Sequence, residues 1–456
     1  MDTKKLRQKI LDLAIHGKLV PQDPNDEPAS VLLERIKAEK ERLIKEGKIK
    51  RSKKSAKTSD TPHYQQNVPF EVPKGWVWTN IEHICSKIGS GSTPRGSNYS
   101  SEGIPFFRSQ NIYNSGLVYE DIKFISKEVH QTMIGTEVLP NDLLLNITGG
   151  SLGRCAIVPA NFQQGNVSQH VCIMRPIFVV PRYFHAFVLS SVFSKSMKIT
   201  GSGREGLPKY NLERMFFPLP PLPEQHRIVL EIDHWFALIN QIEQNKLDLQ
   251  EVIKQAKSKI LNLAIHGKLV SQDPNDESAI ELLKCINPNF TPCDNGHSGK
   301  LPQGWCTCKY TDIYTDISSK PYQILKSQIQ ESGKYPVVSQ SAKHIEGFTD
   351  SCNVFSHSLP CILFGDHTRV VKYIDFDFVV GADGVKIQCP KVNAKWAYYI
   401  MEYVSFHIVN KGYSRHFGQV VKFTYALPPL AEQQRIVVKI EELFSNLDNI
   451  QKALEA

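Results

Sequence analysis

The side chains in this sequence that are best suited to molecular recognition occur in short polar runs. An Arg-Ser-Gln-Asn run occupies residues 108–111, and a Ser-Gln-His run occupies residues 168–170. Arginine can form two parallel hydrogen bonds with guanine, and asparagine or glutamine can do so with adenine. We therefore predict that such runs contact nucleic-acid bases, the alternative for each single residue being an ordinary exposed polar side chain. The predicted residues are Thr93, Arg95, Arg108, Ser109, Gln110, Asn111, Ser168, Gln169, His170, Arg204, Gln340, Lys343, His344, His367, Arg369, Arg415 and His416.

The sequence favours binding over catalysis. It contains no GxxxxGK[ST] phosphate loop, no HExxH motif and no Asn-Pro-Pro-aromatic tetrapeptide. Asp375 and Asp377 alternate along an expected strand, where they are interpreted as surface acids rather than a metal-binding pair. Four possible zinc ligands, Cys293, His297, Cys306 and Cys308, do not have the spacing of a standard zinc site. We therefore predict a non-catalytic chain without a metal site.

Composition sets further limits. The chain has 456 residues, of which 41% are hydrophobic and 22% are charged, as expected for a soluble protein of two or three domains. It has no apolar run of the ~18 residues that a membrane-spanning helix needs and no apolar signal segment at Met1, so a cytoplasmic protein is expected. Of the net charge of +8, residues 37–57 carry +7, from ten Lys/Arg and three Glu. Bulk charge is therefore weak support for nucleic-acid binding.

An internal repeat organises the chain. Residues 10–29 read ILDLAIHGKLVPQDPNDEPA and residues 260–279 read ILNLAIHGKLVSQDPNDESA, with seventeen of twenty positions identical. PPLPEQHRIV at 220–229 returns as PPLAEQQRIV at 428–437. The blocks between these segments show little similarity to each other. We interpret the repeated segments as connectors that share one task and the blocks as two domains with different tasks.

The connectors are predicted to be long helices. After Pro223, apolar residues recur at spacings of four and three, and Gly267 marks the end of the helix. About 40 residues at ~1.5 Å each predict a rod of roughly 60 Å. Joining the two chain ends would nearly recreate the central helix, which indicates a circular repeat with pseudo-two-fold symmetry. The fold class is therefore predicted as α+β, with two β-rich α/β domains separated by two long antiparallel, coiled-coil-like helical regions.

The predicted domain boundaries follow from these features. They are a helical segment at 1–36, a basic polar linker at 37–71, a first recognition domain at 72–222, a central helical region at 223–286, a linker at 287–300, a second recognition domain at 301–429 and a terminal helix at 430–456.

The doubled Pro-Pro-Leu-x-Glu-Gln-x-Arg-Ile motif and the LAIHGKLV segments resemble the specificity subunits of type I restriction-modification systems over nearly the whole chain. The resemblance implies a non-catalytic subunit whose two recognition domains each read one half of a bipartite double-stranded DNA target. It also implies that two methyltransferase subunits dock on the helices and that two motor-nuclease subunits join them. S-adenosylmethionine, ATP and Mg²⁺ would then be bound by the partner subunits. The docking helices would contribute Glu224, Gln225, Arg227, Ile228, Glu432, Gln433, Arg435 and Ile436.

Two other functions fit the sequence less well. The chain could be a coiled-coil scaffold with two protein-binding heads, which sequence-selective DNA binding by the heads would exclude. It could also be a stand-alone DNA-modifying enzyme, which would show activity with Mg²⁺ or a methyl donor in the absence of partners.

Overall fold

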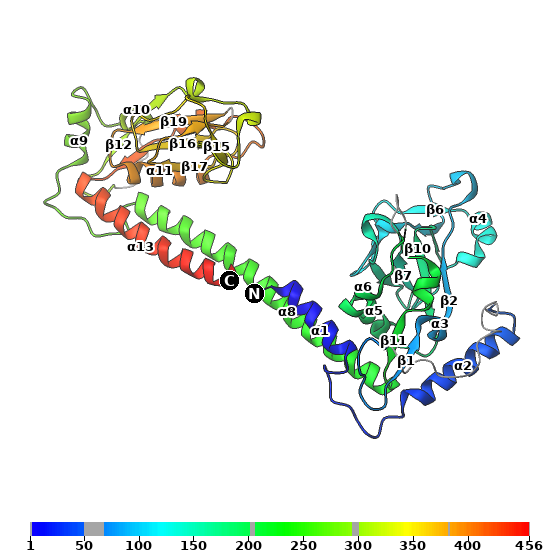
Figure 1. The fold of residues 1–456 in the computed structure, drawn as a ribbon. Coiled ribbons are helices and arrows are strands. Elements are labelled where there is room, and N and C mark those ends of the chain that lie inside the picture. Colours follow the sequence, from blue (N-terminus) through cyan, green and yellow to red (C-terminus); the bar gives the residue numbers. More distant parts are fainter. Residues whose placement is uncertain (1, 50–67, 201–205, 294–300, 382–383, 456) are drawn as a thin grey trace. The chain divides into compact units, whose positions relative to one another are not determined.

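The computed structural model describes residues 2–49, 68–200, 206–293, 301–381 and 384–455 (Figure 1). The chain divides into an N-terminal unit, residues 2–244, and a C-terminal unit, residues 245–456. Helix α8 (Leu222–Ile265) contributes its first half to the N-terminal unit and its second half to the C-terminal unit. Arg204 and His297 lie outside the described residues.

The N-terminal unit is built around a four-stranded antiparallel sheet in the order β2-β10-β7-β8 and a three-stranded sheet in the order β6-β3-β9. The strands before and after this block, β1 and β11, pair with each other, so the block begins and ends at one place. The strands are β1 (Val77–Asn80), β2 (Cys85–Ser90), β3 (Ile104–Phe107), β4 (Ile112–Tyr113), β5 (Gly116–Leu117), β6 (Lys123–Ile125), β7 (Leu143–Asn146), β8 (Cys155–Ile157), β9 (Asn166–Val167), β10 (Val171–Pro176) and β11 (Phe216–Leu219). The helices of this unit besides α8 are α1 (Thr3–Ile15), α2 (Ala29–Lys45), α3 (Ile81–Ile84), α4 (Lys127–Thr132), α5 (Pro181–Leu189), α6 (Ser191–Ser196) and α7 (Lys209–Glu213).

The C-terminal unit repeats this strand order despite its different sequence. Its four-stranded sheet has the order β13-β19-β16-β17, its three-stranded sheet the order β15-β14-β18, and β12 pairs with β20. A parallel pair occurs at the same place in both units, β3 with β9 and β14 with β18. The strands are β12 (Cys306–Cys308), β13 (Tyr314–Ile317), β14 (Tyr335–Val338), β15 (Gly347–Thr349), β16 (Cys361–Gly365), β17 (Val371–Ile374), β18 (Val379–Val380), β19 (Val385–Pro390) and β20 (Tyr425–Leu427). The helices besides α8 are α9 (Ala279–Ile286), α10 (Tyr310–Ile313), α11 (Ala394–His407), α12 (Phe417–Val421) and α13 (Leu430–Glu455).

Each four-stranded sheet is covered on both faces, which explains why its strands are apolar throughout. Successive side chains of a strand point to opposite faces. Leu143 and Leu145 of β7 join the core formed with α5, whereas Leu144 joins the core formed with β3 and β9. In the C-terminal unit, Phe364 of β16 packs with the α11 core and Leu363 packs with the β14–β18 core.

The predicted helical seam is confirmed only near the domain cores. Ile228, Ile232 and Ile239 of α8 are buried, whereas Trp235 and Ile242 are 40% and 41% exposed. Of these five residues, which recur along the helix at spacings of four and three, three are buried in the core of the N-terminal unit and two are partly exposed. The predicted linker 37–71 also begins with helix, since α2 continues to Lys45.

The two units use the same helix contact. In the N-terminal unit, Arg7 of α1 lies 5.2 Å from the ring centroid of Phe236 and bonds Glu243 at 2.9 Å. In the C-terminal unit, Lys257 of α8 lies 5.3 Å from the ring of Phe444 on α13 and bonds Asp448 at 2.5 Å. Each pair of helices runs antiparallel within its own unit (Figure 1).

Candidate nucleic-acid interface

In the N-terminal unit, four loops meet where strands β2, β3, β7 and β9 end. Backbone N–H groups of Ser92 and Ser168 donate to Val167 and Phe107 carbonyls at 3.1 and 2.9 Å, and Ile147 N–H donates to the His170 carbonyl at 3.0 Å. We call residues 91–95, 108–111, 146–153 and 168–170 the N-terminal loop cluster. It brings together several of the predicted base-contacting residues, which lie far apart in the sequence.

Gly91 permits this convergence. A Cβ atom at Gly91 would lie 1.8 Å from the carbonyl oxygen of Val167, so no other residue fits without moving the backbone. The β2 loop therefore lies directly against the β9 loop, which fixes where the side chains after Gly91 are presented.

A chain of side-chain hydrogen bonds runs through this cluster. Thr148 Oγ1 and His170 Nδ1 are 2.8 Å apart, and His170 Nε2 lies 3.1 Å from Gln169 Nε2. Thr93 Oγ1 donates to Gln169 Oε1. Gln169 and Thr93 are exposed, so their polar groups are held at the surface rather than inside the core.

Other predicted residues of this cluster have internal roles. Asn111 is fully buried and donates to the carbonyls of Val118 and Glu120 at 3.0 and 3.1 Å. Arg108 is half-buried and donates to the Asp121 carbonyl at 2.9 Å. Asn111 therefore shapes the loop rather than offering a free amide, whereas Arg95 and Gln110 are exposed. Ser109 is half-buried and Ser168 is 4% exposed.

The C-terminal unit has a corresponding cluster at the ends of β14, β16 and β18. Gln340 Oε1 accepts from the His367 N–H at 3.2 Å, and the Gln340 carbonyl accepts from Thr368 Oγ1 at 2.6 Å. A Cβ at Gly384 would lie 2.9 Å from His367 and 3.0 Å from Gln340, so a small residue is needed where these loops meet. We call residues 339–344, 365–369, 384 and 411–416 the C-terminal loop cluster.

Aromatic and cationic groups give this second cluster a different surface. The Tyr413 ring, 86% exposed, stacks on His367 with centroids 4.6 Å apart and planes at 11°. Lys343 and Arg415 are exposed, and His344 is exposed with its ring 5.8 Å from that of Phe376. The surface therefore combines cations with stacked rings, both of which bind nucleic acid.

A buried lysine supports the same loop. Lys372 of β17 is 5% exposed and donates from Nζ to the carbonyls of Ser339, at 2.8 Å, and Lys343. Burial lowers the pKa of the Lys372 amine. The lysine thus fixes the backbone that carries Gln340 and Lys343 rather than reaching solvent.

Two predicted residues of the C-terminal unit are placed in structural roles. His416 is fully buried; its N–H donates to Asp366 Oδ1 at 2.8 Å, and its Nε2 accepts from the Lys411 N–H at 3.1 Å. Arg369 is directed towards the carbonyls of Ser405 and Ile408 at the end of α11, at 3.4 and 3.5 Å. Their hydrogen bonds therefore favour a structural role for His416 and Arg369 over contact with bases.

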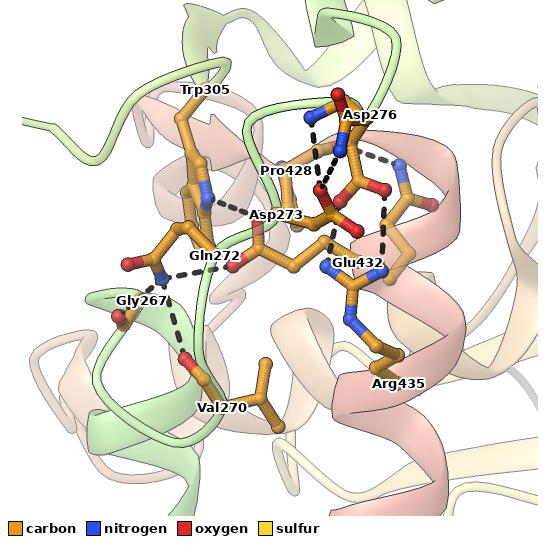
Figure 2. A network of polar contacts seen from close by, with 11 residues as sticks. Gly267, Val270, Gln272, Asp273, Asp276, Trp305, Pro428, Glu432 and Arg435 are labelled. Carbon is orange, nitrogen blue, oxygen red and sulfur yellow. Dashed lines mark hydrogen bonds and ion pairs between the residues drawn. The ribbon is translucent and has the colours of Figure 1, made fainter.

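The predicted docking residues form a matched pair of internal networks. Figure 2 shows the one in the C-terminal unit. Glu432, 1% exposed, accepts from Trp305 Nε1 at 2.9 Å and from Gln272 Nε2 at 3.1 Å. Arg435 pairs with Asp276 at 2.6 Å. The repeated QDPND loop is thereby tied to the first turns of α13.

The N-terminal unit contains the same network at the start of α8. Glu224 accepts from Trp76 at 2.9 Å and from Gln22 at 3.1 Å, and Arg227 pairs with Asp26 at 2.6 Å. Burial raises the pKa of the Glu224 carboxyl, against the effect of its hydrogen bonds from Trp76 and Gln22. We call these two networks the Trp–Glu clamps.

The remaining docking residues are also engaged within the chain. Gln225 and Gln433 donate to the carbonyls of Pro220 and Pro428 at 3.0 and 2.9 Å, and both are fully buried. Ile228 and Ile436 are core residues. These contacts within the chain are sufficient to explain why the motif occurs in both units. Docking of partner subunits on the helices stays a prediction.

Some residues at the loop clusters were not predicted from the sequence. They include Thr148, Lys372 and Tyr413. Only Thr148 carried a usable signal, since it follows the apolar run of β7 directly and precedes two glycines. Lys372 and Tyr413 reach the cluster through the fold alone.

The sequence Gly-Gly-Ser-Leu-Gly at 149–153 has the spacing of a nucleophile elbow. Such an elbow places its serine between a strand and a helix, with a histidine within hydrogen-bond reach. Ser151 instead lies in a 3-10 turn, and its hydroxyl oxygen accepts from Asn146 Nδ2 at 3.1 Å. Its role is therefore to shape the loop that follows β7.

Metal binding and membrane insertion find no support in the described part of the chain. No group of three or more His, Cys, Asp or Glu side chains among these residues is arranged to hold a metal ion. Burial raises the pKa of the Cys306 thiol to about 12 and also raises the pKa of the Cys308 thiol, which disfavours the thiolate that zinc requires. None of the described helices is long and apolar enough to cross a membrane.

Comparison with known proteins relates the repeat to one family. A family model described as "Type I restriction modification DNA specificity domain" matches residues 73–252 and 302–456. The chain is 31% identical over 388 residues to the specificity subunit of type I restriction enzyme EcoAI from Escherichia coli, covering 70% of this chain and 64% of that subunit. It is 29% identical over 385 residues to the EcoEI specificity subunit from the same species, covering 69% and 62%. The match thus spans less than two thirds of the length of each relative.

Solved structures share the fold at low sequence identity. The HsdS subunit from Thermoanaerobacter tengcongensis gives a TM-score of 0.50 at 16% identity, covering 84% of this chain and 93% of that chain. A chain from structural work on complex assembly and conformational transition of the type I R-M system gives 0.56 at 17% identity, covering 85% and 94%. The predicted α+β class, with two β-rich repeats and a long central helix, is confirmed.

Proposed function

The chain belongs to the type I restriction-modification DNA specificity family, and from this premise we propose that it binds double-stranded DNA sequence-specifically. Each loop cluster reads one half of a bipartite target. One observation carries this proposal. The sheets of the two units share one strand order, but the loops that follow equivalent strands carry different polar side chains. A common framework with two different reading surfaces is what an asymmetric, two-part target requires.

The helices are proposed to serve as spacer and docking surface. Helix α8 is continuous over 44 residues, which corresponds to ~66 Å at 1.5 Å per residue. Two methyltransferase subunits would dock on the helical regions, and two motor-nuclease subunits would complete the complex. The chain itself would be non-catalytic and cytoplasmic, and S-adenosylmethionine, ATP and Mg²⁺ would be bound by the partner subunits.

Genome-wide methylation mapping tests the proposed function. A strain that expresses this chain with its neighbouring methyltransferase should methylate a bipartite motif with a fixed gap, and deletion of this chain should abolish that motif. An unchanged methylome, together with failure of the purified chain to capture the methyltransferase, would contradict the proposal. Nuclease or methyltransferase activity of the chain alone would contradict its non-catalytic role.

A further inference from the structure

Gln169 occupies an unusual position in the N-terminal loop cluster, because an exposed amide is held at both of its ends. Its oxygen accepts from Thr93 Oγ1, and its nitrogen lies 3.1 Å from His170 Nε2. His170 is itself held by Thr148, 2.8 Å from Nδ1. A surface glutamine normally loses rotamer entropy when it binds a ligand, and a side chain ordered in advance avoids that loss.

The direction of each bond in this chain follows from the chemistry of the groups. An amide nitrogen donates and does not accept, so His170 Nε2 must be the acceptor. The proton of the neutral ring then lies on Nδ1 and is donated to Thr148 Oγ1. Thr93 donates its hydroxyl proton to Gln169 Oε1. Contacts with the described residues therefore leave the Gln169 amide with one N–H and one oxygen lone pair, on two atoms that are bonded to the same carbon, Cδ.

These two free groups match one base better than the others. In the major groove adenine presents an acceptor, N7, beside a donor, the N6 amino group. Guanine presents two acceptors, which would require both N–H groups of the amide, and one of these is engaged by His170. Cytosine and thymine each offer a single hydrogen-bonding group there.

We propose that Gln169 reads an adenine in one half-site through two hydrogen bonds, with Thr93, His170 and Thr148 as positioning residues. This inference rests on the proposed function and adds the side chain and the base. Its consequence is specific: one A·T position in one half-site depends on Gln169, whereas the other half-site and the gap do not.

Methylation mapping with variants of the full chain, expressed with the methyltransferase, tests this inference. Gln169→Ala should make one adenine position of one half-site degenerate, with discrimination at that position reduced about ten- to hundredfold. Gln169→Glu keeps the size of the side chain but has only hydrogen-bond acceptors. It should shift the preference at that position towards cytosine, because a carboxylate can accept a hydrogen bond from the cytosine amino group. Gln164→Ala is the matched control, because Gln164 is an exposed glutamine at the opposite end of β9, and it should leave the motif unchanged.

Thr148→Val tests the positioning chain separately. Val has the shape of Thr but cannot accept the hydrogen bond from His170 Nδ1–H. The same single base position should therefore become degenerate, while the rest of the motif stays the same. The inference is overturned if Gln169→Ala and Gln169→Glu leave both half-sites intact, or if the relaxed position is a G·C pair. Failure of the proposed function is distinct, because the unaltered chain would then specify no bipartite motif at all.

Discussion

The N-terminal and C-terminal units differ at their loop clusters and agree at the Trp–Glu clamps, where the connecting segments join each domain. The Trp–Glu clamps have the same distances in both, 2.9 Å from tryptophan to glutamate and 3.1 Å from glutamine to glutamate. The loop clusters share no such pattern. One holds an amide between a hydroxyl and an imidazole, and the other stacks Tyr413 on His367. The framework is therefore constrained by folding, and the loops at its strand ends are free to differ.

Size differences between the units support the same interpretation. Helix α2 has 17 residues and its counterpart α9 has 8. Among the residues that the structure describes, only the N-terminal block has the β4–β5 hairpin in addition to the shared strand order. These additions lie outside the clamps and the paired β1–β11 and β12–β20 strands. The two units therefore differ in length only at places that leave the clamps and these paired strands unchanged.

The largest expected effect comes from breaking a clamp. Glu224→Ala and Glu432→Ala should each lower the free energy of unfolding by about 3 kcal/mol, because each leaves a buried indole N–H without its acceptor and removes the hydrogen bond from the glutamine amide. Since the two networks have the same geometry, the two losses should agree within about 0.5 kcal/mol. Chemical denaturation of each variant measures both values. A loss in only one unit would show that the clamps are not equivalent.

A smaller effect is expected at the close approach within the N-terminal loop cluster. Gly91→Ala should cost about 2 kcal/mol, because its Cβ would lie 1.8 Å from the Val167 carbonyl oxygen and the backbone must move. Gly89→Ala, with nothing within 4 Å of its Cβ, is the control for the intrinsic effect of the substitution. Thermal denaturation compares the two. Equal midpoints would mean that the loops do not meet as described.

The buried lysine of the C-terminal loop cluster should influence one half-site only. Lys372→Met keeps the length of the side chain but removes the donor to the Ser339 and Lys343 carbonyls. We expect the free energy of DNA binding to become less favourable by about 1 to 2 kcal/mol, because the loop that carries Gln340 loses the hydrogen bonds that hold its backbone. Binding assays with single half-site substitutions would locate the loss. Weakened discrimination at the half-site read by the N-terminal unit would contradict this assignment.

The smallest expected effect concerns pH. Because burial raises the folded-state pKa of Glu224, its contribution to stability is present below the unfolded pKa and is lost as pH rises through the folded value. The stability of the unaltered chain relative to Glu224→Gln should therefore decrease as pH rises. Glu243, whose pKa is lowered by hydrogen bonds from Thr3 and Arg7, should show the opposite trend in Glu243→Gln. If the stability of the unaltered chain relative to Glu224→Gln instead increased as pH rises, burial would not raise the pKa of Glu224.

The sequence predicted the repeat and its helices well, because those features are local or are copied within the chain. The short apolar run at 142–147 predicts a strand, and it contains β7; the sequence at 393–409 predicts a helix, and it contains α11. The sequence also predicts one helix at 181–198, but the structure divides it into α5 and α6 at Ser190, whose hydroxyl caps α6 by accepting from the Phe193 N–H. Such a break depends on a cap that periodicity does not reveal.

The common strand order of the two blocks could not be predicted from the sequence. Apolar alternation defines strands but not their partners, so two dissimilar sequences with one topology look unrelated. The clamps were within reach, since Trp76, Glu224 and Gln22 all recur in the second repeat as Trp305, Glu432 and Gln272. Base-contact residues were the least predictable, because burial turned Asn111 and His416 into loop supports.

Exchange of one block between relatives tests the central claim most directly. Residues 77–219 would be replaced by the corresponding block of another family member, with both Trp–Glu clamps retained, and the methylated motif would be mapped. The account predicts that one half-site changes to that of the donor, while the other half-site is unaltered. A change in both half-sites, or in neither, would contradict the claim that each unit reads its own half of the target.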